Sequence, residues 1–282
     1  LEKKESSLAY AVQKVRGEEL NRVKEVNMIT ALAGKAAGVQ VSKNSSGMGG
    51  SAKVSIRGVR SVAGDNQPLY VIDGVPMLNS TSEQSYSAIG GTANAGNRDG
   101  GDGISNLNPE DVESISILKG APAAALYGSQ AANGVILITT KKGNTVGRRD
   151  IHFSTGLTFE KAFSLPEMQN SYGVSDVTDS WGEKENLTVY DNLGDFFRTG
   201  LTSITSVSVN SGNDKLQTYF SYANTTGRGI LNENKLSKHN INLRETAVLF
   251  NSRLKLDGNV NVMKQTVKNK PVSGGFYMNP LV

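Results

Sequence analysis

The stretch ISNLNPEDVESISILKGAPAAALYGSQAANGVILITTKKG (residues 104–143) predicts an alternation of turns, strands and short helices. Asn108 suits the N-cap of a helical turn, Pro109 suits its first position, and acidic residues follow within that turn. A strand with isoleucines on one face is expected over residues 114–119. APAAALYGSQAA then predicts a short helix, and GVILITTKK, which is rich in β-branched residues, predicts another strand. The stretch therefore indicates a small α/β domain.

The residues before this stretch favour the same fold class. PLYVIDGVP (residues 68–76) begins with a short buried strand and continues into the turn signal Asp73-Gly74. A helix is expected from Asn27, as its N-cap, to Gly38. Residues 79–103 are rich in Gly, Ser, Asn and Asp and predict a loop. Asp73 is either a catalytic acid at a strand end or a corner of the scaffold, and Asp-Gly corners are far more often plain turns.

After Lys142 the pattern changes to strands in which apolar and polar residues alternate. RLKLDGNVNVMK (residues 253–264) has one apolar face, formed by Leu254, Leu256, Val260 and Val262. Its polar face is formed by Lys255, Asp257, Asn259 and Asn261. Residues 215–224 and 238–245 repeat this pattern, and Ser-Gly-Asn-Asp at residues 211–214 predicts a hairpin. Such strands fit a soluble sandwich or barrel, and equally an outer-membrane barrel with apolar residues toward lipid.

Composition argues against several classes of function. The chain has 282 residues and a net charge of only +4, with no cluster of Lys and Arg interleaved with aromatic residues, so nucleic-acid binding has little support. The absence of cysteine excludes disulfides, thiolate catalysis and Cys-based zinc sites. No run of about 18 apolar residues is present to predict a transmembrane helix.

Signatures of catalysis are missing from the sequence, which contains no GxxxxGK[ST], HExxH or GxSxG. The glycine-rich SGMGGSA (residues 46–52) does not join a strand to a helix, which argues against dinucleotide binding. Asp99 and Asp102 lie in a segment similar to a calcium-binding loop, but the regular spacing and the terminal Glu are absent. Glu110, Asp111 and Glu113 are best explained as complements to the dipole of the first helical turn.

The remaining candidate residues have simple structural explanations. His152 and His239 lie far apart in alternating strands without an acidic or serine partner, and both are expected on a polar surface or in a lumen. Trp181, near Tyr190, fits an interfacial position or a core position. The sequence therefore assigns no catalytic residue, no cofactor site and no metal ligand.

Three stretches together carry a specific resemblance to a known family. They are VSIRGVRS (residues 54–61), PLYVIDGVP (residues 68–76) and the stretch 104–143. They resemble the plug domain of TonB-dependent outer-membrane transporters, and they are most similar to the SusC/RagA-like branch, which imports glycans, peptides and other nutrients in Bacteroidota. The resemblance covers about residues 8–143, whereas residues 149–282 are placed in the following barrel by pattern and position.

The resemblance implies an α/β plug domain at residues 1–145, followed by antiparallel β-strands of an incomplete transmembrane β-barrel at residues 146–282. The family barrel has about 22 strands, so the chain is expected to be a fragment that ends within the barrel. Asp73 is then a scaffold residue that hydrogen-bonds within its own turn. Four glycines are expected to be backbone requirements at corners, namely Gly58, Gly120, Gly128 and Gly134. Leu254, Leu256, Val260 and Val262 are expected to face lipid.

The function implied by the resemblance is TonB-dependent, energy-coupled uptake of glycans or peptides across the bacterial outer membrane, with the plug gating the lumen. The implied partners are the inner-membrane TonB complex, a SusD-like surface lipoprotein, the substrate and outer-membrane lipid. Substrate contacts are expected in extracellular loops and in plug loops such as residues 79–103. The protein is not expected to be an enzyme or to hold a cofactor.

Other hypotheses make different demands on the sequence. A soluble carbohydrate-binding module of α/β plus β-sandwich type needs clustered exposed aromatic residues, whereas aromatic residues make up 6% of the chain and are scattered. A hydrolase that used Asp73, or Asp99 with Asp102, would need converging carboxylates. A signalling transducer of the same family would need an additional periplasmic domain before Leu1.

Overall fold

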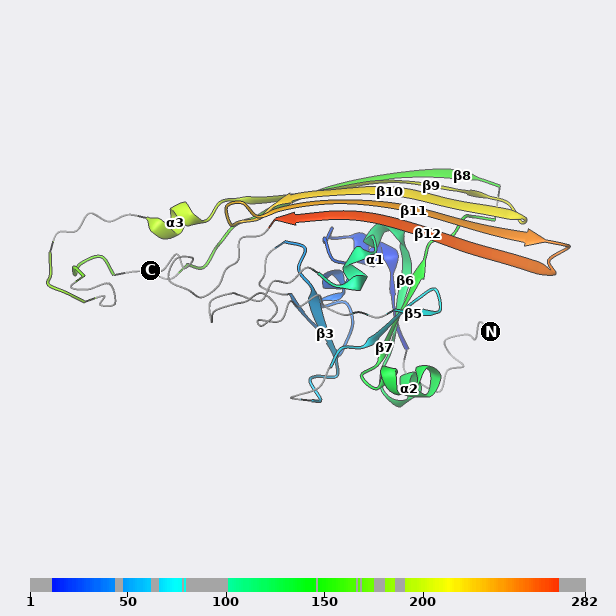
Figure 1. The fold of residues 1–282 in the computed structure, drawn as a ribbon, viewed down its shortest axis with the longest axis horizontal. Coiled ribbons are helices and arrows are strands. Elements are labelled where there is room, and N and C mark those ends of the chain that lie inside the picture. Colours follow the sequence, from blue (N-terminus) through cyan, green and yellow to red (C-terminus); the bar gives the residue numbers. More distant parts are fainter. Residues whose placement is uncertain are drawn as a thin grey trace, which may run out of the picture.

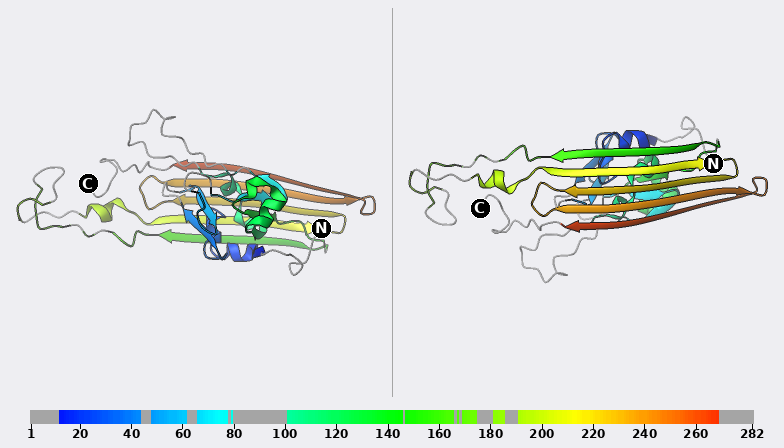
Figure 2. Two further views of the ribbon diagram at one scale, coloured as in Figure 1. Left: turned by 90° about the horizontal axis from the view of Figure 1, so that it is seen from below. Right: turned by 90° about the horizontal axis from the view of Figure 1, so that it is seen from above.

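The computed structural model consists of an N-terminal unit and a long five-stranded sheet. The sheet lies across one side of that unit (Figure 1). It describes residues 12–43, 48–61, 66–77, 79, 101–145, 147–165, 167, 169–174, 181–185 and 191–268. The long sheet is called the wall here. Figure 2 shows that the N-terminal unit covers one face of the wall and that no described element covers the other.

The N-terminal unit is built on a mixed sheet with the strand order β1-β6-β7-β4-β5. Its strands are β1 (Val12–Arg16), β4 (Leu69–Ile72), β5 (Val75–Met77), β6 (Val112–Leu118) and β7 (Val135–Thr140). β4 and β7 are parallel neighbours, and the other pairs are antiparallel. A separate hairpin joins β2 (Val39–Lys43) to β3 (Ala52–Ile56). The helical segments are short: α1 (Gly17–Asn21), η2 (Thr30–Leu32), η4 (Gly103–Asn106), η5 (Pro109–Asp111), α2 (Ala121–Tyr127) and η6 (Ser129–Ala131).

The hydrophobic core of this unit lies on both faces of the mixed sheet because its central strands are apolar on both sides. One cluster packs Ile115, Ile117 and Ile136 against residues of β1, α1, β2 and β3. A smaller cluster packs Leu118 and Val135 beneath α2 and η6. Both clusters lie entirely within residues 12–138, so the wall contributes no side chain to either.

The wall consists of five antiparallel strands whose order in space is their order in the sequence. They are β8 (Arg149–Glu160), β9 (Gly200–Gly212), β10 (Leu216–Arg228), β11 (Lys235–Leu249) and β12 (Leu254–Lys268). Short turns at residues 213–215 and 250–253 lie at one end. The other end carries the connection over residues 161–199, which includes α3 (Asn192–Phe196), and the shorter connection over residues 229–234. The hairpin expected at residues 211–214 is confirmed.

The two faces of the wall show the reverse of the distribution usual in a water-soluble sheet. The face toward the N-terminal unit, called the inner face, buries many polar side chains: Thr202, Ser206, Ser221, Thr225, Lys238, Asn240, Asn242, Arg244 and Thr246. Ile204, Tyr219, Ala223 and Leu236 are buried on the same face. The opposite outer face is apolar and exposed: Ile151, Phe153, Leu157, Phe159, Phe220, Ile241, Leu243, Leu254, Leu256, Val260 and Val262. The strand alternation therefore points apolar side chains away from the protein interior.

The expected α/β unit followed by antiparallel strands is confirmed, but the expectation of a helix from Asn27 to Gly38 is wrong. Instead of a helix over residues 27–38 there is only the 3₁₀ turn η2, because Gly34 and Gly38 adopt φ of 74° and 70° and interrupt the helix. Asn27 is not the N-cap of η2, which is Ile29, but its side chain accepts a hydrogen bond from the Ile29 amide at 2.9 Å in the preceding turn. The strand β1 was not expected, since its polar residues resemble those of the helix that follows. No helix among the described residues is long and apolar enough to cross a membrane.

Gly134 shows why the corner glycines are needed. Its φ is 101°, and a Cβ there would lie 2.9 Å from the Ile56 side chain and 3.0 Å from the Leu118 carbonyl oxygen. Gly134 therefore lets β7 start directly beside β3 and β6. The other expected glycines also have positive φ: Gly58, Gly120 and Gly128. The expected loop over residues 79–103 lies outside the described residues, apart from Asn79 and residues 101–103.

Because the outer face of the wall is apolar and the inner face carries many polar side chains, we expect a new charge to destabilise the protein more on the outer face than on the inner face. We expect Val260→Arg to destabilise the full-length protein in a lipid bilayer by about 2–4 kcal/mol, the cost of Arg on the lipid face near the midplane. The neighbouring Asn259→Arg, which places the same side chain on the inner face, is the matched control and should cost much less. Urea unfolding in lipid vesicles measures both, and the reverse order of stability would contradict this assignment of the faces.

Candidate functional site

The inner face of the wall and the N-terminal unit meet through a series of polar contacts, which form the candidate site. Arg244 on β11 makes the most extensive of them. Its Nη1 donates to Asp73 Oδ2 at 2.8 Å and to Thr140 Oγ1 at 2.5 Å. Its Nε and Nη2 donate to the two carboxylate oxygens of Asp257 on β12, each at 2.9 Å. Only 5% of the Arg244 side chain is exposed, so one guanidinium fastens the corner after β4 to two wall strands.

Asp73 is positioned for this contact by its backbone. Its φ of 48° turns the chain sharply between β4 and β5, and its amide donates to the Ile138 carbonyl at 2.9 Å. Its carboxylate accepts hydrogen bonds from the Thr140 amide at 3.0 Å and the Thr140 hydroxyl at 2.6 Å. Asp73 is thus structural, as expected, but its partners lie on β7 and β11 and not in its own turn.

Asp111 makes a second contact, with β10. Its fully buried carboxylate accepts a hydrogen bond from the Tyr219 hydroxyl at 3.0 Å. Burial raises the pKa of the Asp111 carboxyl above its ordinary value, and hydrogen bonds from Ser221, Tyr219 and Asn108 oppose that shift. Burial likewise lowers the pKa of the neighbouring Lys141, against the opposing attraction of Asp111. The junction of η5 with the wall therefore holds an acid whose charged form is disfavoured.

Two donors on β11 satisfy carbonyl groups at the end of η4. The buried Lys238 donates from Nζ to the Ser105 carbonyl at 2.5 Å, and Asn240 donates to the Asn106 carbonyl at 2.7 Å. Helix ends leave such carbonyl groups without partners of their own. Asp102 caps the other end of η4 by accepting from the Ser105 amide at 2.9 Å, and it also accepts from the Ala52 amide at 3.2 Å. Asp102 therefore stabilises η4, the segment whose carbonyl groups bind to the wall.

Lys24 supplies the contact to β8. Its ammonium group forms an ion pair with Glu110 and a hydrogen bond with the Ser154 hydroxyl. Its aliphatic stem lies against Gly156, where a Cβ would come within 2.6 Å of Lys24 Cγ. The absence of a side chain at Gly156 thus allows Lys24 to lie flat on the wall.

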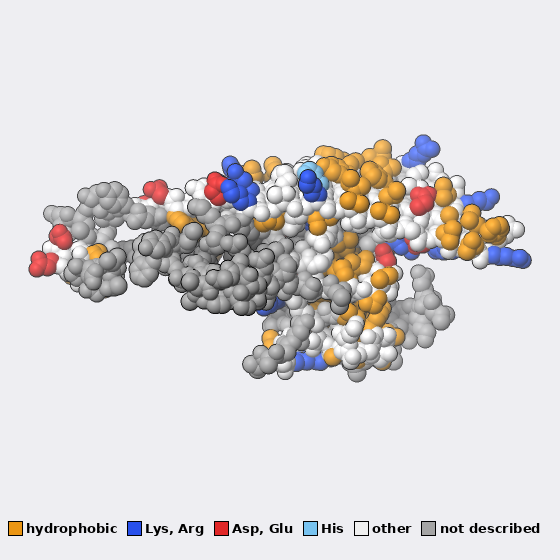
Figure 3. Space-filling model, viewed as in Figure 1, with side chains coloured by type: hydrophobic (Ala, Val, Ile, Leu, Met, Phe, Trp, Pro, Cys, Tyr) orange, Lys and Arg blue, Asp and Glu red, His pale blue; other side chains and the backbone are white. Residues whose placement is uncertain are grey.

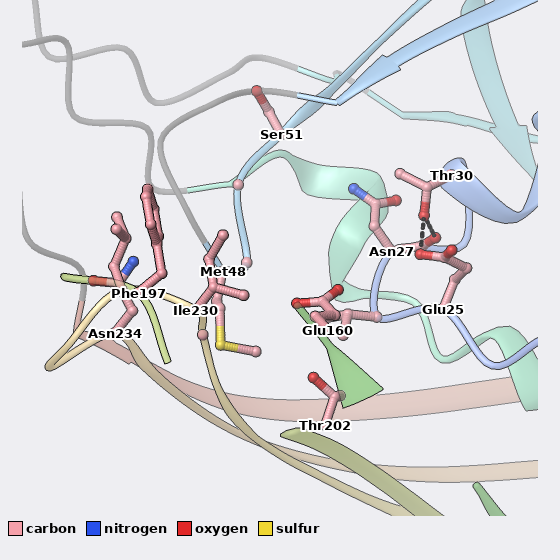
Figure 4. Close-up of a pocket in the computed structure, with 15 residues that line it drawn as sticks. Glu25, Asn27, Thr30, Met48, Ser51, Glu160, Phe197, Thr202, Ile230 and Asn234 are labelled. Atoms are coloured by element: carbon pink, nitrogen blue, oxygen red, sulfur yellow. Dashed lines mark hydrogen bonds between the residues drawn. The ribbon is translucent and has the colours of Figure 1, made fainter. Parts of the chain in front are cut away.

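A cavity of about 330 Å³ opens between the N-terminal unit and the wall, at the end that carries the long connection over residues 161–199 (Figure 4). Its polar lining includes Glu25, Asn27, Thr30, Glu160, Thr202 and Asn234, and Met48, Phe197 and Ile230 add apolar surface. Thr30 is held by hydrogen bonds to Glu25 at 3.1 Å and to the Asn27 carbonyl at 2.7 Å. A cavity of this size and mixed lining suits a small polar ligand or part of a larger one.

The expectation for the acidic run after Asn108 needs correction. Asn108 caps η5 as expected, accepting from the Glu110 amide at 3.2 Å. Glu110 and Asp111, however, do more than complement a helix dipole, because they bind Lys24 and Tyr219, while Glu113 is exposed. Sequence reasoning also missed the roles of Arg244 and Lys238. Both residues could have been recognised in the sequence, because each is a charged residue on the polar side of a strand whose other side is apolar.

The two histidines lie on opposite faces of the wall. His239 shares the parity of Ile241 and is exposed on the outer face, in a row with Asn224 and Lys264. Its Nδ1 is 2.9 Å from the Tyr222 hydroxyl. His152 is exposed on β8. Trp181 is 70% exposed and packs on Tyr172 at a ring distance of 5.4 Å, so it is not a core residue.

Two of the residues considered for chemistry, Asp99 and Tyr190, lie outside the described residues. Within the described part of the chain, no group of three or more His, Asp or Glu side chains is placed to hold a metal ion. Many polar groups of the site are instead paired across the junction, whereas the buried Asn242 side-chain amide and Thr246 hydroxyl have no hydrogen-bond partner among the described residues. The paired groups suit the arrangement to holding two parts of the protein together.

Comparison with known proteins explains this arrangement. The family model of the TonB-dependent Receptor Plug Domain matches residues 4–135. The TonB-dependent receptor SusC of Bacteroides thetaiotaomicron is 30% identical over 96% of this chain and 26% of its own length. TonB-dependent receptor P26 of Formosa agariphila is 34% identical over 58% of this chain and 15% of its own length. The chain thus spans about a quarter or less of the length of these relatives.

Solved structures share the fold over nearly the whole chain. The RagAB peptide importer in its open-open state superposes with a TM-score of 0.77 at 24% identity, covering 98% of this chain and 32% of that chain. The siderophore receptor PirA of Acinetobacter baumannii gives a TM-score of 0.54 at 19% identity, covering 93% of this chain and 32% of its own. Such receptors reside in the outer membrane, which accounts for the exposed apolar outer face of the wall. The chain therefore belongs to the SusC/RagA-like TonB-dependent receptors of the bacterial outer membrane, and its N-terminal unit is their plug.

Proposed function

We propose that the protein performs TonB-dependent, energy-coupled uptake of nutrients, either glycans or peptides, across the outer membrane. The plug gates the lumen behind the wall. The observation that carries this proposal is the junction itself, in which a separately packed plug is held to an inverted wall by hydrogen bonds and ion pairs. No side chain of the wall enters the plug's hydrophobic clusters, so the plug can shift without losing its core.

The lengths of the connections orient the molecule. Outer-membrane barrels have short periplasmic turns and longer extracellular loops. The turns at residues 213–215 and 250–253 then lie on the periplasmic side, and the connection over residues 161–199 lies outside the cell. In this orientation the cavity lined by Glu25, Thr30 and Asn234 opens toward the extracellular side, where it would contact incoming substrate.

The same proposal assigns domains and partners. The plug occupies residues 1–145 and the barrel begins at residue 146, which is supported by the confinement of both hydrophobic clusters to residues 12–138. The partners are the TonB complex of the inner membrane and a SusD-like surface lipoprotein, as the homology to SusC suggests. Glycan and peptide remain the two substrate classes, the latter supported by the shared fold of the RagAB peptide importer. The protein is not an enzyme in this proposal, in keeping with its receptor homologues.

The alternative of a soluble carbohydrate-binding module is not favoured. A β-sandwich would bury the apolar parity of these strands against a second sheet. In the wall the apolar parity is exposed, at 61% for Val260 and 58% for Val262, while the polar parity of the neighbouring strand β11 is buried.

Cross-linking the plug to the wall should stop uptake. Asn106 and Asn240 contact each other across the junction, and the chain contains no native cysteine. We expect cells carrying Asn106→Cys with Asn240→Cys, joined by a cleavable bis-maleimide, to lose TonB-dependent uptake of glycan and peptide mixtures and to regain it when the linker is cleaved. Each single variant treated with the reagent is the control. Uptake at the normal rate despite complete cross-linking would contradict gating by plug movement.

Removing Arg244 should weaken plug docking. Arg244→Ala leaves the Asp73 and Asp257 carboxylates facing each other, and removal of one partner from a buried ion pair costs about 3–5 kcal/mol. We expect the lower part of that range, because 19% and 28% of the two acidic side chains are exposed. Protease sensitivity of the plug in the full-length protein measures the effect, with Arg253→Ala in an exposed turn as the control. Equal sensitivity of both variants would contradict the role of Arg244.

The buried Asp111 should make docking dependent on pH. Because folding raises the pKa of this carboxyl, its contribution to stability is greatest below the unfolded value of 3.8 and is lost as pH rises through the folded pKa. We therefore expect the free energy of unfolding of the wild type, relative to Asp111→Asn, to fall as pH rises from about 4 to about 8. Urea titrations at several pH values test this, with the exposed Glu113→Gln as control. A constant difference across that range would disprove it.

A further inference from the structure

The outer face of the wall carries four cations beside its apolar residues on β10, β11 and β12. This cationic patch consists of Arg228, Lys235, Lys264 and Lys268, all of which are exposed. The pairing register aligns three of them in one row across the sheet, since Arg228 lies opposite Lys235 and Lys235 lies opposite Lys268. Figure 3 shows Lys and Arg side chains on this side of the exposed apolar surface, toward the end of the wall that leads to α3.

Such a row is electrostatically unfavourable by itself. Like charges directly opposite each other on neighbouring strands destabilise a sheet. Within the described residues, Glu233 pairs with Lys268 at 2.6 Å, whereas no ion pair is found for Arg228, Lys235 or Lys264. The patch therefore keeps an excess of positive charge, which an anion from outside the chain would offset.

The residues between the patch and the apolar surface are ordered in rows. The last apolar row joins Tyr222, Ile241 and Val262. Above it lie Asn224, His239 and Lys264, then a row of hydroxyl groups, then the row of three cations; the hydroxyl row is Thr226, Ser237 and Thr266. Polar, hydrogen-bonding side chains thus fill the space between the lower cation and the upper three.

The distance of the patch cations from the apolar surface indicates which kind of lipid could bind them. Lys268 follows Val262 by six positions on β12, a distance of about 20 Å along a strand, or about 15 Å of height for a strand tilted by about 40°. The headgroup region of a phospholipid bilayer is only about 5–8 Å thick on each side. Lys264 lies within that layer and the upper row lies beyond it, so a phospholipid alone cannot reach both levels.

We propose that the cationic patch binds a phosphorylated glycolipid of the outer leaflet. Lys264 takes one phosphate next to the acyl chains, the hydroxyl row faces the sugars, and Arg228 with Lys235 takes a second phosphate at the far end of those sugars. The apolar residues below hold the acyl chains. This binding rests on the proposed orientation, with the wall in the outer membrane and the connection over residues 161–199 outside the cell, but it does not depend on the proposed uptake.

The test compares two variants with the same loss of charge in the full-length protein, kept in a neutral detergent. In the patch variant, Arg228, Lys235 and Lys264 are replaced by Gln. In the control variant, three exposed cations at the periplasmic end are replaced by Gln: Arg149, Lys215 and Arg253. The probes are lipid A with two phosphates, the same lipid A without phosphate, phosphatidylglycerol and inorganic phosphate, and dissociation constants are measured by native mass spectrometry. Circular dichroism checks that both variants are folded.

We expect the phosphorylated lipid A to bind the patch variant at least about tenfold more weakly than the wild type, and the control variant within about twofold of it. The dephosphorylated lipid A should bind weakly to all three proteins. Equal losses in both variants, or tight binding by the dephosphorylated form, would overturn the proposal. So would phosphatidylglycerol binding as tightly as lipid A, or full competition by inorganic phosphate. If the patch variant does not fold, the single variant Lys235→Gln replaces it and should still bind lipid A about threefold more weakly.

Discussion

Hydrogen bonding of the wall's inner face is the constraint on which the rest of the structure depends. The inner parity of β11 presents Lys238, Asn240 and Arg244 in a buried setting, and buried polar groups without partners destabilise a protein. The plug provides those partners through the Ser105 and Asn106 carbonyls and the Asp73 carboxylate. The plug therefore supplies hydrogen-bond partners to these three side chains, and the same contacts hold the plug against the wall.

Polar contacts of this kind suit a junction that opens, as the proposed uptake requires. A hydrogen bond contributes only about 0.5–1.5 kcal/mol net, because water replaces the partner when the bond is broken. The plug's two hydrophobic clusters, in contrast, contain no residue of the wall. Moving the plug away from the wall would break the polar contacts of the junction and leave the hydrophobic clusters of the plug intact. The junction is therefore the interface that separates most easily. The Asp111 carboxyl is buried in the junction and its pKa is raised, so its ionisation as the pH rises weakens the junction further.

The wall performs two different tasks on its two faces, and the strand alternation makes this possible. A one-residue step along β11 passes from Arg244, which binds the plug, to Leu243, which is exposed to the membrane. Toward the end of the wall that carries the connection over residues 161–199, the outer parity changes from Ile241 to His239 and then to Lys235. In the proposed orientation this is the extracellular end. The cavity and the cationic patch both lie at this end, on opposite faces.

The sequence by itself determined the two-part organisation, the strands β4, β6 and β7, the cap at Asn108, the corner glycines and the parity of β12, because each depends on local propensity or on a two-residue period. Resemblance in three short stretches indicated the family. Only the tertiary structure decided that Asp73 meets Arg244, that Asp111 meets Tyr219 and that Lys24 lies on Gly156. These pairs are separated by more than one hundred residues, and local patterns carry no information about which polar groups a folded interface brings together.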